Sequence, residues 1–189
     1  PPRSTLSPSS AASDVYKRQL FRFAKPMELG RIPLKEFKRF IIEKFHKAGG
    51  SIREEIAGKI LDYTKGHPYF TQQLCHEIWN LNKNVRDASI IEEAIDRIIA
   101  HHSAEYEQIW DLLRGRGQRN LLRGMSLEPD ANIFSARFIE RYGVRSASHV
   151  KKAYDALEKK GIVERIPPDK MGKIGDIFFA EWIRRLSRR

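Results

Sequence analysis

The sequence contains one cysteine among 189 residues, so no internal disulfide bond can form. A lack of disulfide bonds is typical of proteins in a reducing compartment. No apolar run approaches the roughly 20 residues of a membrane-spanning helix, which predicts no membrane partner. The first residues also lack the apolar segment of a secretory signal peptide. Together these absences indicate a cytoplasmic protein.

Motifs for phosphate and metal chemistry are also missing. No segment matches Gly-x-x-x-x-Gly-Lys-Ser/Thr; Gly58-Lys59 and Gly172-Lys173 both lack the earlier glycine and the following hydroxyl. The histidines and Cys75 form neither Cys-x-x-Cys nor His-Glu-x-x-His. We therefore expect no metal site, no catalytic residue and no ATP hydrolysis from this chain alone.

Residues 1–19 are rich in Ser, Pro and Ala and show neither helical nor strand periodicity. The stretch TLSPSSAASDVYKRQ is similar to a translated sequencing-adapter remnant, which would make residues 1–19 a disordered, non-native leader. In that case the natural gene continues upstream of Leu20. A native disordered tail is the alternative.

Five helices are predicted between residues 33 and 114, because apolar residues recur there at helical spacing. Pro33 and Pro68 suit first helical turns, where the missing N–H has no cost. Caps are expected at three further starts: Ser51 with Glu54, Asp87 and Ser103. The first helix carries the stripe Leu34, Phe37, Phe40, Ile41 and Phe45.

Gly115-Arg116-Gly117 is the best candidate for a domain boundary, and the pattern changes after it. Three short helices are predicted, the second and third capped by Ser135 and Ser146. A strand from Ile162 to Ile166, a turn, a returning strand that includes Ile174 and Ile177–Phe179, and a short helix around Trp182 follow. This order predicts a winged helix, a helix-turn-helix variant with a small β-hairpin. The fold class is therefore mainly α, with a helical bundle before the winged helix.

The formal net charge is +11, and residues 101–189 supply +6 of it, from 18 basic and 12 acidic side chains. In a winged helix, the third helix enters the major groove of DNA. Asp155 and Glu158 share the exposed face of that helix here, so an ordinary solvated face is the alternative. The predicted nucleic-acid contacts are Arg145, Ser148, His149, Lys151 and Lys152, with Lys170 and Lys173 on the wing.

Gly66-His67-Pro68-Tyr69-Phe70 is a second candidate site. A helix–break–helix corner explains the glycine and the proline, because one ends a helix and the other begins the next. It does not explain a histidine and two aromatic residues at the same joint.

Several segments together resemble the back half of archaeal-type P-loop ATPases of the AAA+/STAND branch, over about Leu20 to Trp182. The segments that carry this resemblance are Phe21-Arg22-Phe23-Ala24, Phe37-x-x-Phe40-Ile41, Gly66-His67-Pro68-Tyr69-Phe70-Thr71-Gln72, Gln118-x-x-Leu121-Leu122, Leu157-x-x-Lys160-Gly161-Ile162-Val163 and Asp176-x-Phe178-Phe179-x-x-Trp182-Ile183.

The resemblance implies that residues 20–32 are a remnant of the ATPase core sheet, 33–114 a helical lid and 117–189 a winged helix with a basic tail. The P-loop would lie upstream, in a core that binds ATP with magnesium. The corner Gly66-His67-Pro68 would face the nucleotide, although we expect no tight ATP binding without that core. The chain would then relay nucleotide state to a partner.

One departure is Asp176-Ile177, where the family usually has Asp-Pro; this could loosen the last turn. The missing P-loop is the larger departure. Two other functions stay open: a DNA-binding transcriptional regulator and a structural protein–protein interaction domain.

Overall fold

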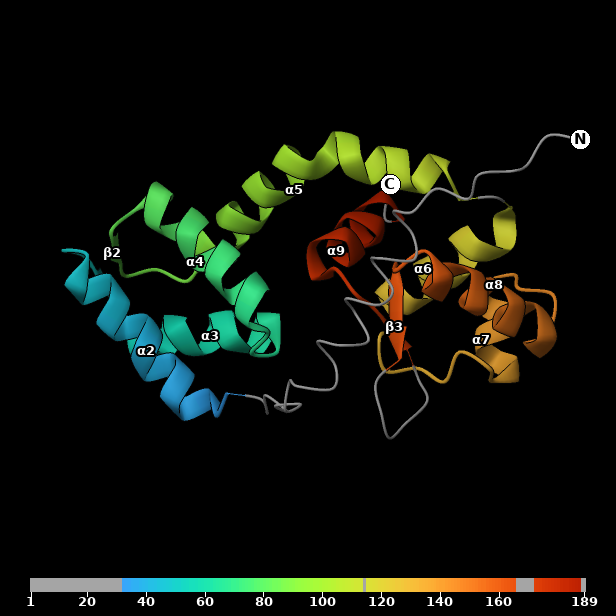
Figure 1. Cartoon of the computed structure of the whole chain (residues 1–189), viewed down its shortest axis with the longest axis horizontal. Coiled ribbons are helices and arrows are strands. Elements are labelled where there is room, and N and C mark those ends of the chain that lie inside the picture. Colours follow the sequence, from blue (N-terminus) through green and yellow to red (C-terminus); the bar gives the residue numbers. More distant parts are fainter. Residues whose placement is uncertain (1–31, 114, 166–171, 188–189) are drawn as a thin grey trace, which may run out of the picture. The chain divides into compact units, whose positions relative to one another are not determined.

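The structure, a computed structural model, describes residues 32–113, 115–165 and 172–187 (Figure 1). These residues form eight helices and two sheets of two strands each, so the fold is mainly helical, as predicted. None of the described helices has both the length and the apolar character needed to cross a membrane. The leader at 1–19, nearly all of the segment 20–32, and Lys170 in the wing lie outside the described residues.

Four helices make up the first half of the described chain: α2 (Leu34–Lys47), α3 (Glu54–Thr64), α4 (Pro68–Leu81) and α5 (Ser89–Asp111). Helix α2 packs on α3, α3 on α4, and α4 along α5. The predicted apolar stripe of α2 is only partly buried, because Leu34 and Phe40 are half-exposed. The buried core of this half includes Phe37, Ile41, Phe45, Ile56, Ile60, Leu74, Ile78 and Ile95.

A short parallel pairing joins β1 (Ser51–Ile52) to β2 (Asn84–Val85). The predicted cap at Ser51 is therefore wrong, since Ser51 Oγ donates to Asn84 Oδ1 at 3.0 Å instead. Helix α3 begins at Glu54 with no side-chain cap. Asn84 belongs to the second strand.

Helix α5 is continuous over 23 residues, whereas the sequence predicted two helices that meet at Ser103. Asp87 accepts the amide of Ser89 at 3.0 Å, as expected at a helix start. Ser103 is no cap: its Oγ donates to the carbonyl of Ala100 at 2.9 Å within the helix. The helix continues because its buried apolar residues extend through both halves, over Ala94, Ile95, Ile98, Tyr106 and Trp110.

The second half contains the predicted order of three helices, a hairpin and a final helix. Ser135 accepts the amide of Phe138, and Ser146 that of His149, which confirms both predicted caps. The elements are α6 (Arg116–Leu127), α7 (Ala136–Arg141), α8 (Ala147–Lys159), β3 (Val163–Arg165), antiparallel β4 (Gly172–Ile174) and α9 (Ile177–Leu186).

Residues 177–179 are helical, so the prediction that they extend the returning strand is wrong. Asp176 Oδ1 accepts the amides of Phe178 at 2.8 Å and Phe179 at 3.1 Å, which starts α9 directly after the hairpin. The pair Asp176-Ile177, which stands where the resembled family usually has Asp-Pro, therefore does not loosen this turn.

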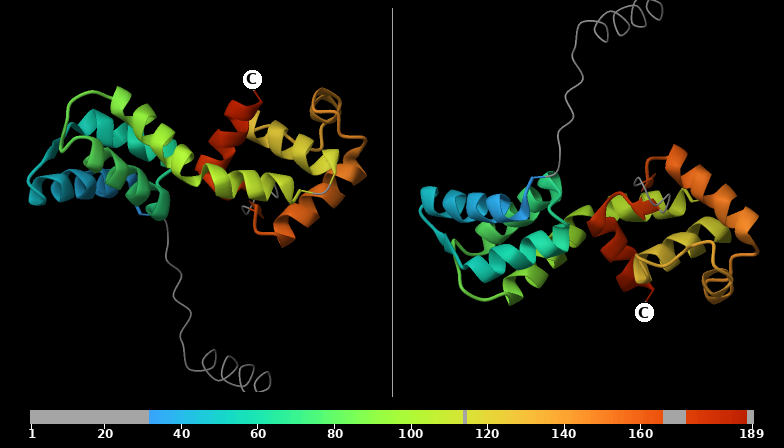
Figure 2. Two further views of the ribbon diagram at one scale, coloured as in Figure 1. Left: turned by 90° about the horizontal axis from the view of Figure 1, so that it is seen from above. Right: turned by 90° about the horizontal axis from the view of Figure 1, so that it is seen from below.

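Helix α9 packs against both α5 and α6, as both views of Figure 2 show. Arg185 on α9 pairs with Glu92 at 2.7 Å and also with Asp96, both on α5. Tyr106 and Trp110 on α5 contact Trp182 on α9 through their rings. The last helix is thus held to the long helix by ion pairs and by aromatic contacts.

Candidate functional site

The corner between α3 and α4 is built by local backbone geometry. Lys65 and Gly66 both have positive φ, at 52° and 68°, and end α3 in the left-handed region. His67 is extended, as expected before proline, and Pro68 occupies the first turn of α4. A buried hydrogen bond of 2.7 Å between the hydroxyls of Thr64 and Thr71 ties the two helices together across the corner.

The predicted residues of this corner are accessible. His67, Pro68 and Tyr69 are exposed, and Gly66 is partly exposed. Helix α4 has no side-chain cap and no acidic residue in its first turn. Its start therefore keeps the unpaired N–H groups and partial positive charge that favour an anion.

Aromatic rings lead from this corner to α9. The His67 ring lies 4.5 Å from that of Phe70, and the Phe70 ring lies 5.8 Å from that of Phe178, edge to face. Tyr63 on α3 contacts the same Phe178 at 6.2 Å. Both phenylalanines are buried. The corner thus has a direct packing contact with the last helix of the second half.

The second candidate surface is the outer face of α8. Its two carboxylates form ion pairs within the chain: Arg165 on β3 binds Asp155 at 3.1 Å and Glu158 at 2.7 Å. Lys151 binds Asp155 at 3.2 Å as well. Lys152 and Lys159 are exposed and form no ion pair with any described residue.

A shallow hollow of about 470 Å³ runs along this face. The structure brings only part of the predicted nucleic-acid set to it, and Arg145 and Lys173 are exposed but do not line it. The ring of His149 is held by Ser146, whose Oγ lies 2.8 Å from Nδ1. The residues that line the hollow are Ser148, Lys151, Lys152, Asp155, Ala156 and Lys159.

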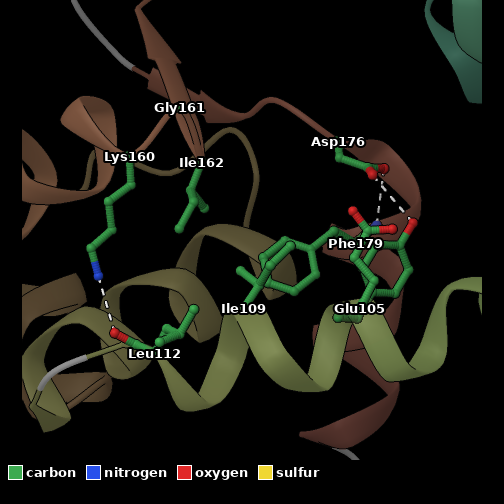
Figure 3. A pocket seen from close by; sticks show the side chains of 9 residues that line it. Glu105, Ile109, Leu112, Lys160, Gly161, Ile162, Asp176 and Phe179 are labelled. Carbon is green, nitrogen blue, oxygen red and sulfur yellow. Dashed lines mark hydrogen bonds between the residues drawn. The ribbon is translucent and has the colours of Figure 1, made fainter.

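A larger hollow of about 690 Å³ lies between α5, the turn after α8 and the start of α9 (Figure 3). Sequence reasoning missed this hollow, although Glu105, Ile109 and Leu112 lie at the i, i+4, i+7 spacing of one helical face. Lys160 Nζ donates to the carbonyl of Leu112 at 3.1 Å and joins the two walls. Among the described residues, no three His, Cys, Asp or Glu side chains form a group that could hold a metal ion.

Residues 104–185 match a family model described as a probable winged helix domain. With the three helices and the hairpin in place, this match decides the fold of the second half. The second half is a winged helix. The match begins within α5, so it includes the end of that helix together with α6–α9. Comparisons with curated proteins and with solved structures found no match. A winged helix is suited to binding DNA or to contacting another protein.

Proposed function

We propose that residues 33–187 act as the nucleotide-responsive lid and winged helix of a P-loop ATPase. The observation that carries the proposal is the contact of Phe70, three residues after the corner at His67, with Phe178 on α9. A ligand bound at the corner would press on a side chain that itself packs against the winged helix.

The chemistry of the corner is compatible with a nucleotide. The exposed start of α4 offers N–H groups to an anion, and the Pro68 and Tyr69 side chains offer an apolar surface to a base. An upstream core would hold the phosphates of ATP and its magnesium ion. Nucleotide state would then shift the corner, and Phe70 would transmit the shift to α9.

The test begins with the coding sequence upstream of Leu20, which the proposal expects to encode Gly-x-x-x-x-Gly-Lys-Ser/Thr. In the protein made from that longer sequence, Pro68→Ala should weaken ATP binding about tenfold. Pro129→Ala is the control, because Pro129 is also an exposed proline but lies in the turn after α6 and not at the corner. Equal ATP affinity of the two variants, or no such loop upstream, would contradict the proposal.

A second function, nucleic-acid binding through α8, is favoured by the ion pairs of Arg165. Because Arg165 and Lys151 together balance the charges of Asp155 and Glu158, the exposed lysines Lys152 and Lys159 dominate the charge of this face. Lysines bind phosphates and read little sequence, so this function would show modest sequence preference.

Binding to a 20-base-pair DNA duplex at several salt concentrations tests this second function. The double variant Lys152→Glu and Lys159→Glu should weaken binding and reduce the slope of log K against log salt by about 2. The control is Lys35→Glu with Lys47→Glu, which makes the same charge change on exposed positions of α2. If the two double variants weaken DNA binding equally, nucleic-acid binding through α8 is contradicted. Protein interaction would then be the remaining role of the winged helix.

A further inference from the structure

The hollow beside α5 takes no part in either function proposed above. Its floor is apolar, formed by Ile109 on α5, Ile162 after α8 and Phe179 on α9. Its rim is exposed, and Leu112 on that rim is 71 % exposed, more than any other large apolar side chain among the described residues. An apolar hollow with so open a rim is suited to a segment of protein chain rather than to an enclosed small molecule.

The charges at the two ends of the hollow restrict what can bind. Glu105 and Asp176 lie at one end and Lys160 at the other, as Figure 3 shows. The Asp176 carboxylate already caps α9 and accepts the Tyr106 hydroxyl. The Glu105 side chain is 65 % exposed, and among the described residues its carboxylate pairs with His102 alone. Exposed acidic groups disfavour the phosphates of a nucleic acid and favour a basic side chain.

A second copy of this chain is disfavoured as the occupant, because each copy carries a net charge of +11 and the copies repel each other. We propose that the hollow binds a segment of a different protein. That segment places large apolar side chains over Ile109 and Ile162, beside Leu112, and a Lys or Arg next to Glu105.

Selection of peptides from a phage-displayed library of random 12-residue sequences on the full chain tests the proposal. Enriched peptides are synthesised with a fluorescent label, and their affinities are measured by fluorescence anisotropy. We expect them to share two large apolar residues with a neighbouring Lys or Arg. Their affinity should fall at least tenfold for Leu112→Asp and for Glu105→Lys.

Each variant has a matched control. Phe40→Asp introduces the same charge at an exposed apolar position on α2. Glu107→Lys makes the same charge reversal two residues along α5, where the side chain is exposed and does not line the hollow. Both controls should bind the peptides as the unmodified chain does. All four changes are at exposed positions, and circular dichroism verifies that each variant is folded.

Three outcomes would overturn the proposal: no enriched peptide, peptides without the apolar and basic pattern, or equal affinity for Leu112→Asp and Phe40→Asp. Light scattering on the unmodified chain tests for a fourth outcome that would overturn the proposal. A concentration-dependent dimer that Leu112→Asp abolishes would assign the hollow to a second copy. None of these outcomes depends on ATP or DNA, so the test is separate from those of the proposed functions.

Discussion

The Tyr106 hydroxyl donates a 3.2 Å hydrogen bond to Asp176 Oδ2, while Oδ1 of the same carboxylate caps α9. One side chain thereby starts the last helix and joins it to the long helix α5. Burial and the neighbouring Asp176 charge raise the pKa of Tyr106 well above its usual value, so the hydroxyl remains a donor.

Replacement of this carboxylate should destabilise the chain more than the loss of an ordinary cap. We expect Asp176→Ala to lower the free energy of unfolding by about 2–3 kcal/mol, because it removes the cap and leaves the Tyr106 hydroxyl without its partner. Ser135→Ala removes only a cap, at α7, and should cost about 1 kcal/mol. Urea unfolding measures both, and equal costs would contradict the double role of Asp176.

The contact between Phe70 and Phe178 should appear as an energetic coupling. Phe70→Leu and Phe178→Leu are each expected to destabilise the fold, and the double variant should be non-additive by about 1 kcal/mol. Phe45 packs on Trp79 instead, so Phe45→Leu combined with Phe178→Leu should be additive. A coupling energy no larger than that of this control pair would contradict an energetic link between the corner and the winged helix.

Two neighbouring glycines should respond very differently to alanine. A Cβ at Gly50 would lie 2.3 Å from the carbonyl oxygen of Lys83, because the β1–β2 pairing brings the two backbones together. A Cβ at Gly49 would meet nothing within 4 Å, although φ is +85°. Thermal unfolding should therefore show a loss of about 1 kcal/mol for Gly49→Ala, from backbone strain alone. Gly50→Ala should lose about 3 kcal/mol, and equal losses would contradict the close approach.

Burial raises the pKa of the Cys75 thiol to about 12, so the native chain should react slowly with a thiol reagent at pH 8 and rapidly in urea. In the unfolded chain the thiol ionises from about pH 9, while the native thiol stays protonated. The Cys75 contribution to stability is therefore complete below pH 9 and is lost as the pH rises toward 12. Cys75→Ala should unfold with a shallower pH dependence across that window, and an identical dependence would contradict the shift.

The sequence predicted the helical caps that depend on neighbouring residues alone. Ser135 and Ser146 each bond an amide three residues later, so the sequence contains both partners of the bond. The same local logic was wrong for Ser51, whose partner Asn84 lies on a strand far along the chain. It was also wrong for Ser103, because the apolar face of α5 continues past it.

Apolar periodicity, caps and glycines act over a few residues, so the sequence was sufficient to predict a mainly helical chain with a winged helix in its second half. Only the packed chain shows that Phe70 meets Phe178 and that Arg165 pairs with both Asp155 and Glu158. The packing also places Leu112 and Lys160 on the walls of one hollow. These contacts join separate elements, and their geometry depends on how whole helices pack, which no local pattern encodes.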